Sequence, residues 1–105
     1  MRPDQNREQV QLDLNNPVFQ KHLFSLPKHD QVAVLGALRK LSAMTWQQIY
    51  AGPGLKWEAI SSRSGPNGSR MYSFRISKKI RGLAYRDNSW LRILSLHADY
   101  DSAYE

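Results

Sequence analysis

The chain has 105 residues and a mass of 12.1 kDa, which is enough for one domain and leaves no room for a second core. Its 15 Lys and Arg residues exceed its 9 Asp and Glu residues, and the net charge of +6 favours a polyanionic partner. The absence of cysteine excludes a disulfide scaffold, a thiol nucleophile and Cys-based metal sites. Because no apolar run is long enough to span a membrane, we expect a cytoplasmic protein.

The first half of the chain carries helix signals. Residues 1–9 are polar and are expected to form a flexible arm in front of a single domain over residues 10–105. Pro17 follows two asparagines, so an Asn can cap the first turn of a helix while Pro occupies its first position. Apolar spacing and the breaks at Pro27 and residues 52–54 then predict three helical segments, 17–26, 30–44 and 46–50.

Strand signals open the chain and dominate its second half. Alternation of apolar and polar residues predicts strands at 10–14, 55–60, 72–76, 80–86 and 90–97. This order predicts an α+β domain in which two N-terminal helices pack on one face of a mainly antiparallel sheet of four to five strands. The other face of the sheet is expected to be free as a working surface.

Positive charge is concentrated between residues 61 and 86, which contain no Asp or Glu. This stretch holds seven cations that are candidates for binding RNA or phosphate: Arg63, Arg70, Arg75, Lys78, Lys79, Arg81 and Arg86. Alternation places Arg75 away from the core face, and Arg81 opens the next strand, so the two can converge on one exposed sheet face. The plainer alternatives are a solvated surface, or a basic face covered by an acidic protein partner.

Several side chains near this basic stretch could transfer protons. Glu58 or His97 could take a proton from a ribose 2′-OH, and Tyr100 or Tyr104 could protonate the leaving oxygen while Arg75 and Arg81 stabilise the charged phosphorane. Such cleavage of RNA needs no metal. The alternatives are an ion pair for Glu58 and a structural role for His97. A metal site built on His97, Asp99 and Asp101 is less favoured, because acids in the tail of a basic protein have simpler explanations.

Three segments together resemble the RelE/ParE superfamily of bacterial toxins. They are Met-Tyr-Ser-Phe-Arg-Ile-Ser at 71–77, Ile-Arg-Gly-Leu-Ala-Tyr-Arg at 80–86, and Trp-Leu-Arg-Ile-Leu-Ser-Leu-His at 90–97. A tail with tyrosines, Asp-Tyr-Asp-Ser-Ala-Tyr at 99–104, follows them as in the family. The resemblance covers about residues 55–105, and the helices before it fit the family's order of elements.

The resemblance implies the toxin of a type II toxin–antitoxin pair, which cuts messenger RNA on the ribosome by 2′-OH attack without metal or other cofactor. It also implies a cognate antitoxin whose acidic segment covers the basic face. Carried over to this chain, it makes Glu58 the base, Arg81 the phosphate stabiliser and Arg75 a further phosphate contact. The acid stays open among His97, Tyr100 and Tyr104, since relatives often carry His where this chain has Tyr100. The alternatives are a ParE-like inhibitor of DNA gyrase and a binding module without catalysis.

Overall fold

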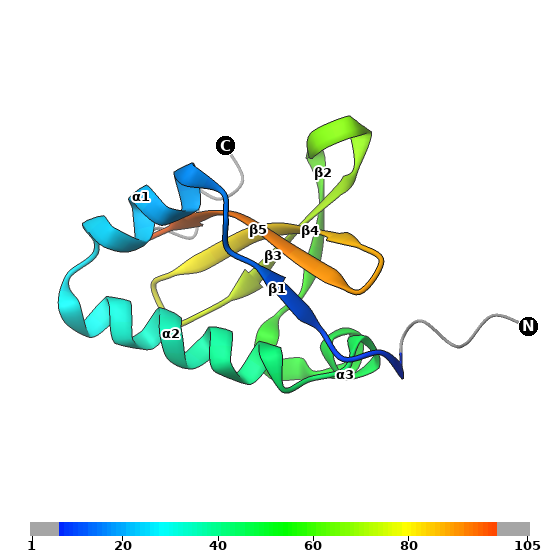
Figure 1. The fold of residues 1–105 in the computed structure, drawn as a ribbon, viewed down its shortest axis with the longest axis horizontal. Coiled ribbons are helices and arrows are strands. Elements are labelled where there is room, and N and C mark those ends of the chain that lie inside the picture. Colours follow the sequence, from blue (N-terminus) through cyan, green and yellow to red (C-terminus); the bar gives the residue numbers. More distant parts are fainter. Residues whose placement is uncertain (1–6, 99–105) are drawn as a thin grey trace, which may run out of the picture.

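The computed structural model describes residues 7–98, apart from the side chains of Pro53 and Arg63. Within this part of the chain, five strands form one sheet in the order β1-β5-β4-β3-β2 (Figure 1). β1 runs parallel to β5, and the remaining neighbours are antiparallel. The strands are β1 (Gln11–Asp13), β2 (Glu58–Ser64), β3 (Arg70–Arg75), β4 (Arg81–Asp87) and β5 (Trp90–His97).

Three α-helices precede the main run of strands: α1 (Pro17–Ser25), α2 (Lys28–Ser42) and α3 (Trp46–Ala51). The side chain of Asn16 caps α1 by accepting hydrogen bonds from the backbone N–H groups of Val18 and Phe19. Thr45 and Gln48 form a capping box at α3, each side chain accepting a hydrogen bond from the other's backbone N–H. These N-caps begin α1 and α3 where the asparagine, proline and threonine signals predict.

All three helices contribute to one apolar core on a single face of the sheet. Phe19 of α1, Leu41 of α2 and Trp46 of α3 meet Phe74 and Leu91 of the sheet there, and all five are almost fully buried. The predicted α+β architecture, with helices on one face of a mainly antiparallel sheet, is therefore confirmed. No helix in residues 7–98 is long and apolar enough to cross a membrane.

Most predicted boundaries lie within two residues of the observed ones, and the structure differs more clearly from the predictions in two regions. The strand expected from residue 55 begins at Glu58, because residues 53–55 form a 3-10 turn and Lys56 adopts a left-handed backbone with φ of 48°. The end of the expected N-terminal arm is tied to the domain. The carbonyl of Glu8 accepts a hydrogen bond from the backbone N–H of Trp46, and Gln9 forms a backbone bridge with Thr45.

Candidate functional site

A row of three predicted site residues runs across three neighbouring strands, β3, β4 and β5, at one end of the sheet. Arg75 on β3 lies directly opposite Arg81 on β4, and Arg81 lies directly opposite His97 on β5. Their neighbours Phe74, Gly82 and Leu96 face the helices, so the three side chains of the row lie on the opposite face. Directly opposite residues on neighbouring strands have Cβ atoms about 4.5–5.5 Å apart, so this row brings two cations and an imidazole together.

A second row on the same face brings in the predicted base. Glu58 pairs with Ser73, Ser73 with Leu83, and Leu83 with Ser95. Ser73, Leu83 and Ser95 each lie two residues along their strand from a member of the first row, so they are on the same face. Glu58 is on this face too, because it pairs with Ser73. Glu58 is exposed and lies at the end of the second row, one strand outward from Ser73. The sheet thus places Glu58 diagonally to Arg75 at one end of the row and far across the sheet from His97.

Arg81 is buried, with only 4% of its surface exposed. Its Nη2 donates hydrogen bonds to the hydroxyl of Ser73 at 2.8 Å and to the backbone carbonyl of Lys56 at 3.3 Å. Ser73 and Leu83 beside it are buried as well, and Leu83 joins a second small apolar cluster. The expectation of a free sheet face is therefore wrong at its centre, because side chains of this face pack on one another there.

Arg75 is the more accessible cation of the row. It is half-buried, and its side chain forms no hydrogen bond or ion pair with another described residue. It lines an open groove of about 570 Å³ between α2, residues 52–55 and the end of β3. The described lining of this groove has two cations and no acid; its members include Gly36, Ala37, Lys40, Leu55, Arg75 and Ile76. Arg75 is the one member of the row that lines this groove.

His97 is held by side chains from two elements. Its Nε2 lies 3.0 Å from the hydroxyl of Ser95 on the same strand. On its other side, the ring of His22 from α1 meets the His97 ring edge to face, with centroids 5.9 Å apart. From the sequence, His22 is interpreted as a surface or packing residue, and Ser95 is not predicted to belong to the site. The available signal was that His22 lies three residues after the buried Phe19 and so on the apolar face of α1.

The other predicted cations do not join the row. Arg86 lies on the helix-covered face, where its guanidinium stacks over the ring of Trp46 at 4.3 Å. Lys79, in the β3–β4 turn, forms an ion pair with Asp30 of α2 at 3.6 Å. Lys78 is exposed in the same turn, Arg70 is exposed at the start of β3, and the side chain of Arg63 is outside the description. The six cations whose side chains are described therefore spread over two faces of the molecule.

Two candidates for the acid lie outside the described residues, namely Tyr100 and Tyr104, as do Asp99 and Asp101 of the less favoured metal hypothesis. Among residues 7–98, no three His, Asp or Glu side chains lie close enough to hold a metal ion. The row and Glu58 therefore make up the part of the predicted site that the structure describes.

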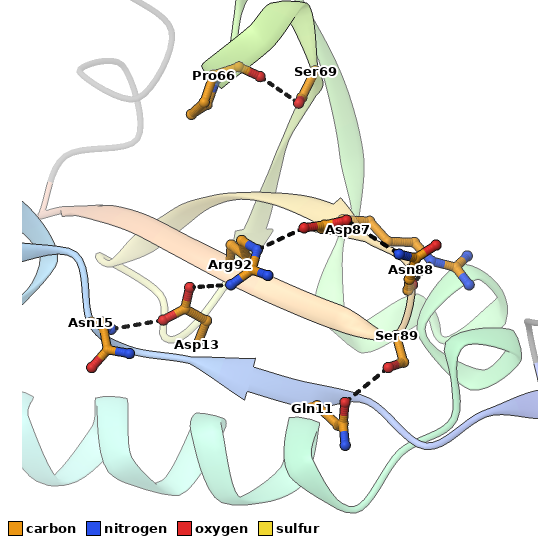
Figure 2. A network of polar contacts seen from close by, with 10 residues as sticks. Gln11, Asp13, Asn15, Pro66, Ser69, Asp87, Asn88, Ser89 and Arg92 are labelled. Atoms are coloured by element: carbon orange, nitrogen blue, oxygen red, sulfur yellow. Dashed lines mark hydrogen bonds and ion pairs between the residues drawn. The ribbon is translucent and has the colours of Figure 1, made fainter.

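The far end of the same sheet face carries a different polar network (Figure 2). Arg92 on β5 donates to Asp13 of β1 at 2.6 Å and to Asp87 of β4 at 3.0 Å, so one guanidinium ties three strands together. The backbone N–H of Asn15 and the Arg92 guanidinium lower the pKa of Asp13. Two carboxylates share one guanidinium in this network, so it adds no positive charge to this end, which leaves the Arg75–Arg81–His97 end as the basic part of the face.

A comparison with solved structures shows the fold. No family model and no curated protein matches the sequence. Among solved structures, the archaeal RelE–RelB complex from Pyrococcus horikoshii matches with a TM-score of 0.59 and 17% identity, over 90% of this chain and 97% of the other. A copper-bound mutant toxin from Helicobacter pylori matches with a TM-score of 0.48 and 16% identity, over 89% and 96% of the two chains. The chain therefore has the fold seen in the RelE–RelB complex.

Proposed function

We propose that this protein is the toxin of a type II toxin–antitoxin pair and a metal-independent endoribonuclease that cuts messenger RNA on the ribosome. The observation that carries the proposal is the cross-strand row of Arg75, Arg81 and His97 on the face away from the helices. The fold shared with the archaeal RelE–RelB complex supports the same assignment and an antitoxin partner.

In the proposed reaction, a base removes the proton of a 2′-OH, and the 2′-oxygen bonds to the adjacent phosphorus. The bond from phosphorus to the 5′-oxygen breaks, and that oxygen takes a proton, which leaves a 2′,3′-cyclic phosphate and a 5′-OH. We assign the base to Glu58 and the acid to His97 on the basis of the chemistry of their side chains. Arg75 contacts the phosphate, and the buried positive charge of Arg81 beside it stabilises the negative charge that develops on the phosphate.

A purified translation reaction tests this proposal against its alternatives. Added protein should stop translation and leave message cut within codons, with a cyclic phosphate at the new 3′ end. A message with a single 2′-deoxy nucleotide at the cleavage site should resist cutting there, because the attacking oxygen is missing. Intact message with inhibited supercoiling in a parallel gyrase assay would overturn the proposal in favour of a gyrase inhibitor, and no effect in either assay would favour a binding module.

A further inference from the structure

The outer edge of β5 is only partly covered by a strand. In the described structure, β1 pairs with residues 90–92 of β5, and α1 lies beside the rest of that strand (Figure 1). Leu96 belongs to this second part and is nearly buried, so its outward N–H group needs a partner other than water. That partner is the Nδ1 atom of His22, at 3.1 Å from the Leu96 nitrogen.

This hydrogen bond fixes the chemical form of His22. A backbone N–H can only donate, so Nδ1 must accept, and the neutral ring then carries its proton on Nε2. The bond also fixes where the ring lies. Phe19, one helical turn earlier on the same face, is buried in the core and anchors α1 against the sheet. His22 is thus held from its own helix and from the strand edge.

The residue after Leu96 is His97, so the position of the Leu96 backbone determines where the His97 side chain begins. The His22 ring lies against the His97 ring at 5.9 Å and 68°, while Ser95 bonds to the far nitrogen of His97. We propose that His22 is a positioning residue that holds the end of β5, and through it His97, in the geometry needed for proton transfer. This inference rests on the proposed role of His97 in RNA cleavage.

Two substitutions at His22 separate the hydrogen bond from the rest of the side chain. His22→Ala removes the acceptor, whereas His22→Asn places its Oδ1 where Nδ1 lies and keeps the acceptor. Gln31→Ala is the matched control: Gln31 of α2 donates to the carbonyl of Leu23, so its loss loosens α1 without touching β5. A role in stability alone would make His22→Ala and Gln31→Ala behave alike.

Cleavage of ribosome-bound message, measured well below the melting temperature of each variant, provides the first readout. We expect His22→Ala to lower kcat about 10-fold with KM nearly unchanged, because misplacing a proton-transfer group slows chemistry more than binding. His22→Asn should restore kcat to within about threefold of wild type, and Gln31→Ala should leave it near wild type. An unchanged kcat in His22→Ala, or an equal loss in Gln31→Ala, would overturn the inference.

Nuclear magnetic resonance provides a second readout that needs no activity. The ring nitrogens of His22 should show the form protonated on Nε2, and the Leu96 amide should be protected from hydrogen exchange. In His22→Ala the Leu96 amide should exchange faster and the His97 ring signals should move, and His22→Asn should reverse the change at Leu96. Unmoved signals overturn the positioning role, whereas wild-type protein that cuts no RNA overturns the proposed function instead.

Discussion

Gly82 on β4 is required because an aromatic ring occupies the place of a side chain. A Cβ atom added there would lie 2.5 Å from Cζ of Phe74, which sits directly opposite on β3 and is fully buried. The close approach lets Phe74 fill the core under the Arg75–Arg81–His97 row. The geometry of the candidate site therefore depends on a residue that has no side chain.

We expect Gly82→Ala to lower the free energy of unfolding by about 1–3 kcal/mol, because the buried ring can move only by displacing its neighbours. Urea unfolding measures the change. Gly36→Ala in α2 is the control, since a Cβ atom there meets nothing within 4 Å, and it should be stabilising by about 0.5–1 kcal/mol. Equal effects from the two substitutions would contradict the packing described for Phe74.

His97 is the residue on which the proposed chemistry depends most directly. We expect His97→Ala to slow cleavage of ribosome-bound message by about 100-fold or more while binding is retained, which is the usual contribution of a positioned acid or base. His29→Ala removes a histidine whose side chain is mostly exposed at the start of α2, and should leave the rate unchanged. Full activity in His97→Ala would move the acid role to Tyr100 or Tyr104.

The sequence indicates the face of a strand residue but not its depth. Alternation correctly puts Arg75 and Arg81 opposite the core face, yet Arg81 is buried and Arg75 is not. The difference arises from contacts made by distant segments, the Ser73 hydroxyl and the Lys56 carbonyl, which stabilise a guanidinium that is otherwise costly to bury. The contacts of Arg86 with Trp46 and of Lys79 with Asp30 could not be predicted either, because these partners are also distant in the sequence.

At the scale of elements, the bounds of β5 could be predicted from its pattern, and those of β2 could not. The bounds of β5, Trp90–His97, agree with the prediction because the strand is central and strongly apolar on its core side. β2 begins three residues later than expected. Leu55 of the 3-10 turn continues the alternation of apolar and polar residues that is typical of a strand, so the pattern places the start too early. The parallel pairing of β1 with β5 joins the two ends of the chain, and no local pattern encodes such a pairing.

The contact between β1 and β5 should make the fold sensitive to acid. The pKa of Asp13 is lowered from its ordinary value of 3.8, first by the backbone N–H of Asn15 and then by Arg92. Its stabilising contribution is therefore complete above that pH and is lost as pH falls through the folded-state pKa. Asp13→Asn should lower the melting temperature at neutral pH and flatten its decline below pH 3.8, as differential scanning calorimetry would measure.

At the scale of the whole molecule, the net charge of +6 suggests more cations on the RNA-binding face than the structure places there. Arg86 stacks on the helix-covered face and Lys79 pairs with Asp30, so neither extends the basic row. Arg75, Lys78 and Arg81 remain at the row or in the adjacent turn. The fold thus concentrates a few cations at the candidate site and uses others to join the sheet to its helices.

This distribution predicts a moderate dependence of RNA binding on salt. Each phosphate contact contributes about −0.7 to the slope of log K against log salt for a single strand, so three or four contacts give about −2 to −3 and seven give about −5. Fluorescence anisotropy with a short single-stranded RNA measures the slope. A slope near zero would indicate that the basic residues serve a protein partner, and a slope near −5 would contradict the separation into two faces.

Primer extension on a translated reporter message in cells tests the central claim most directly. Arg75→Ala removes the accessible cation of the row, whereas Arg81→Ala would also leave the buried Ser73 and Lys56 groups without their donor. Arg39→Ala removes the same charge from an exposed residue of α2 that belongs neither to the row nor to the groove lining, and is the control. We predict discrete cuts within codons for wild type and Arg39→Ala and none for Arg75→Ala. Growth arrest without cuts in the wild type, or identical cuts in all three proteins, would contradict the account.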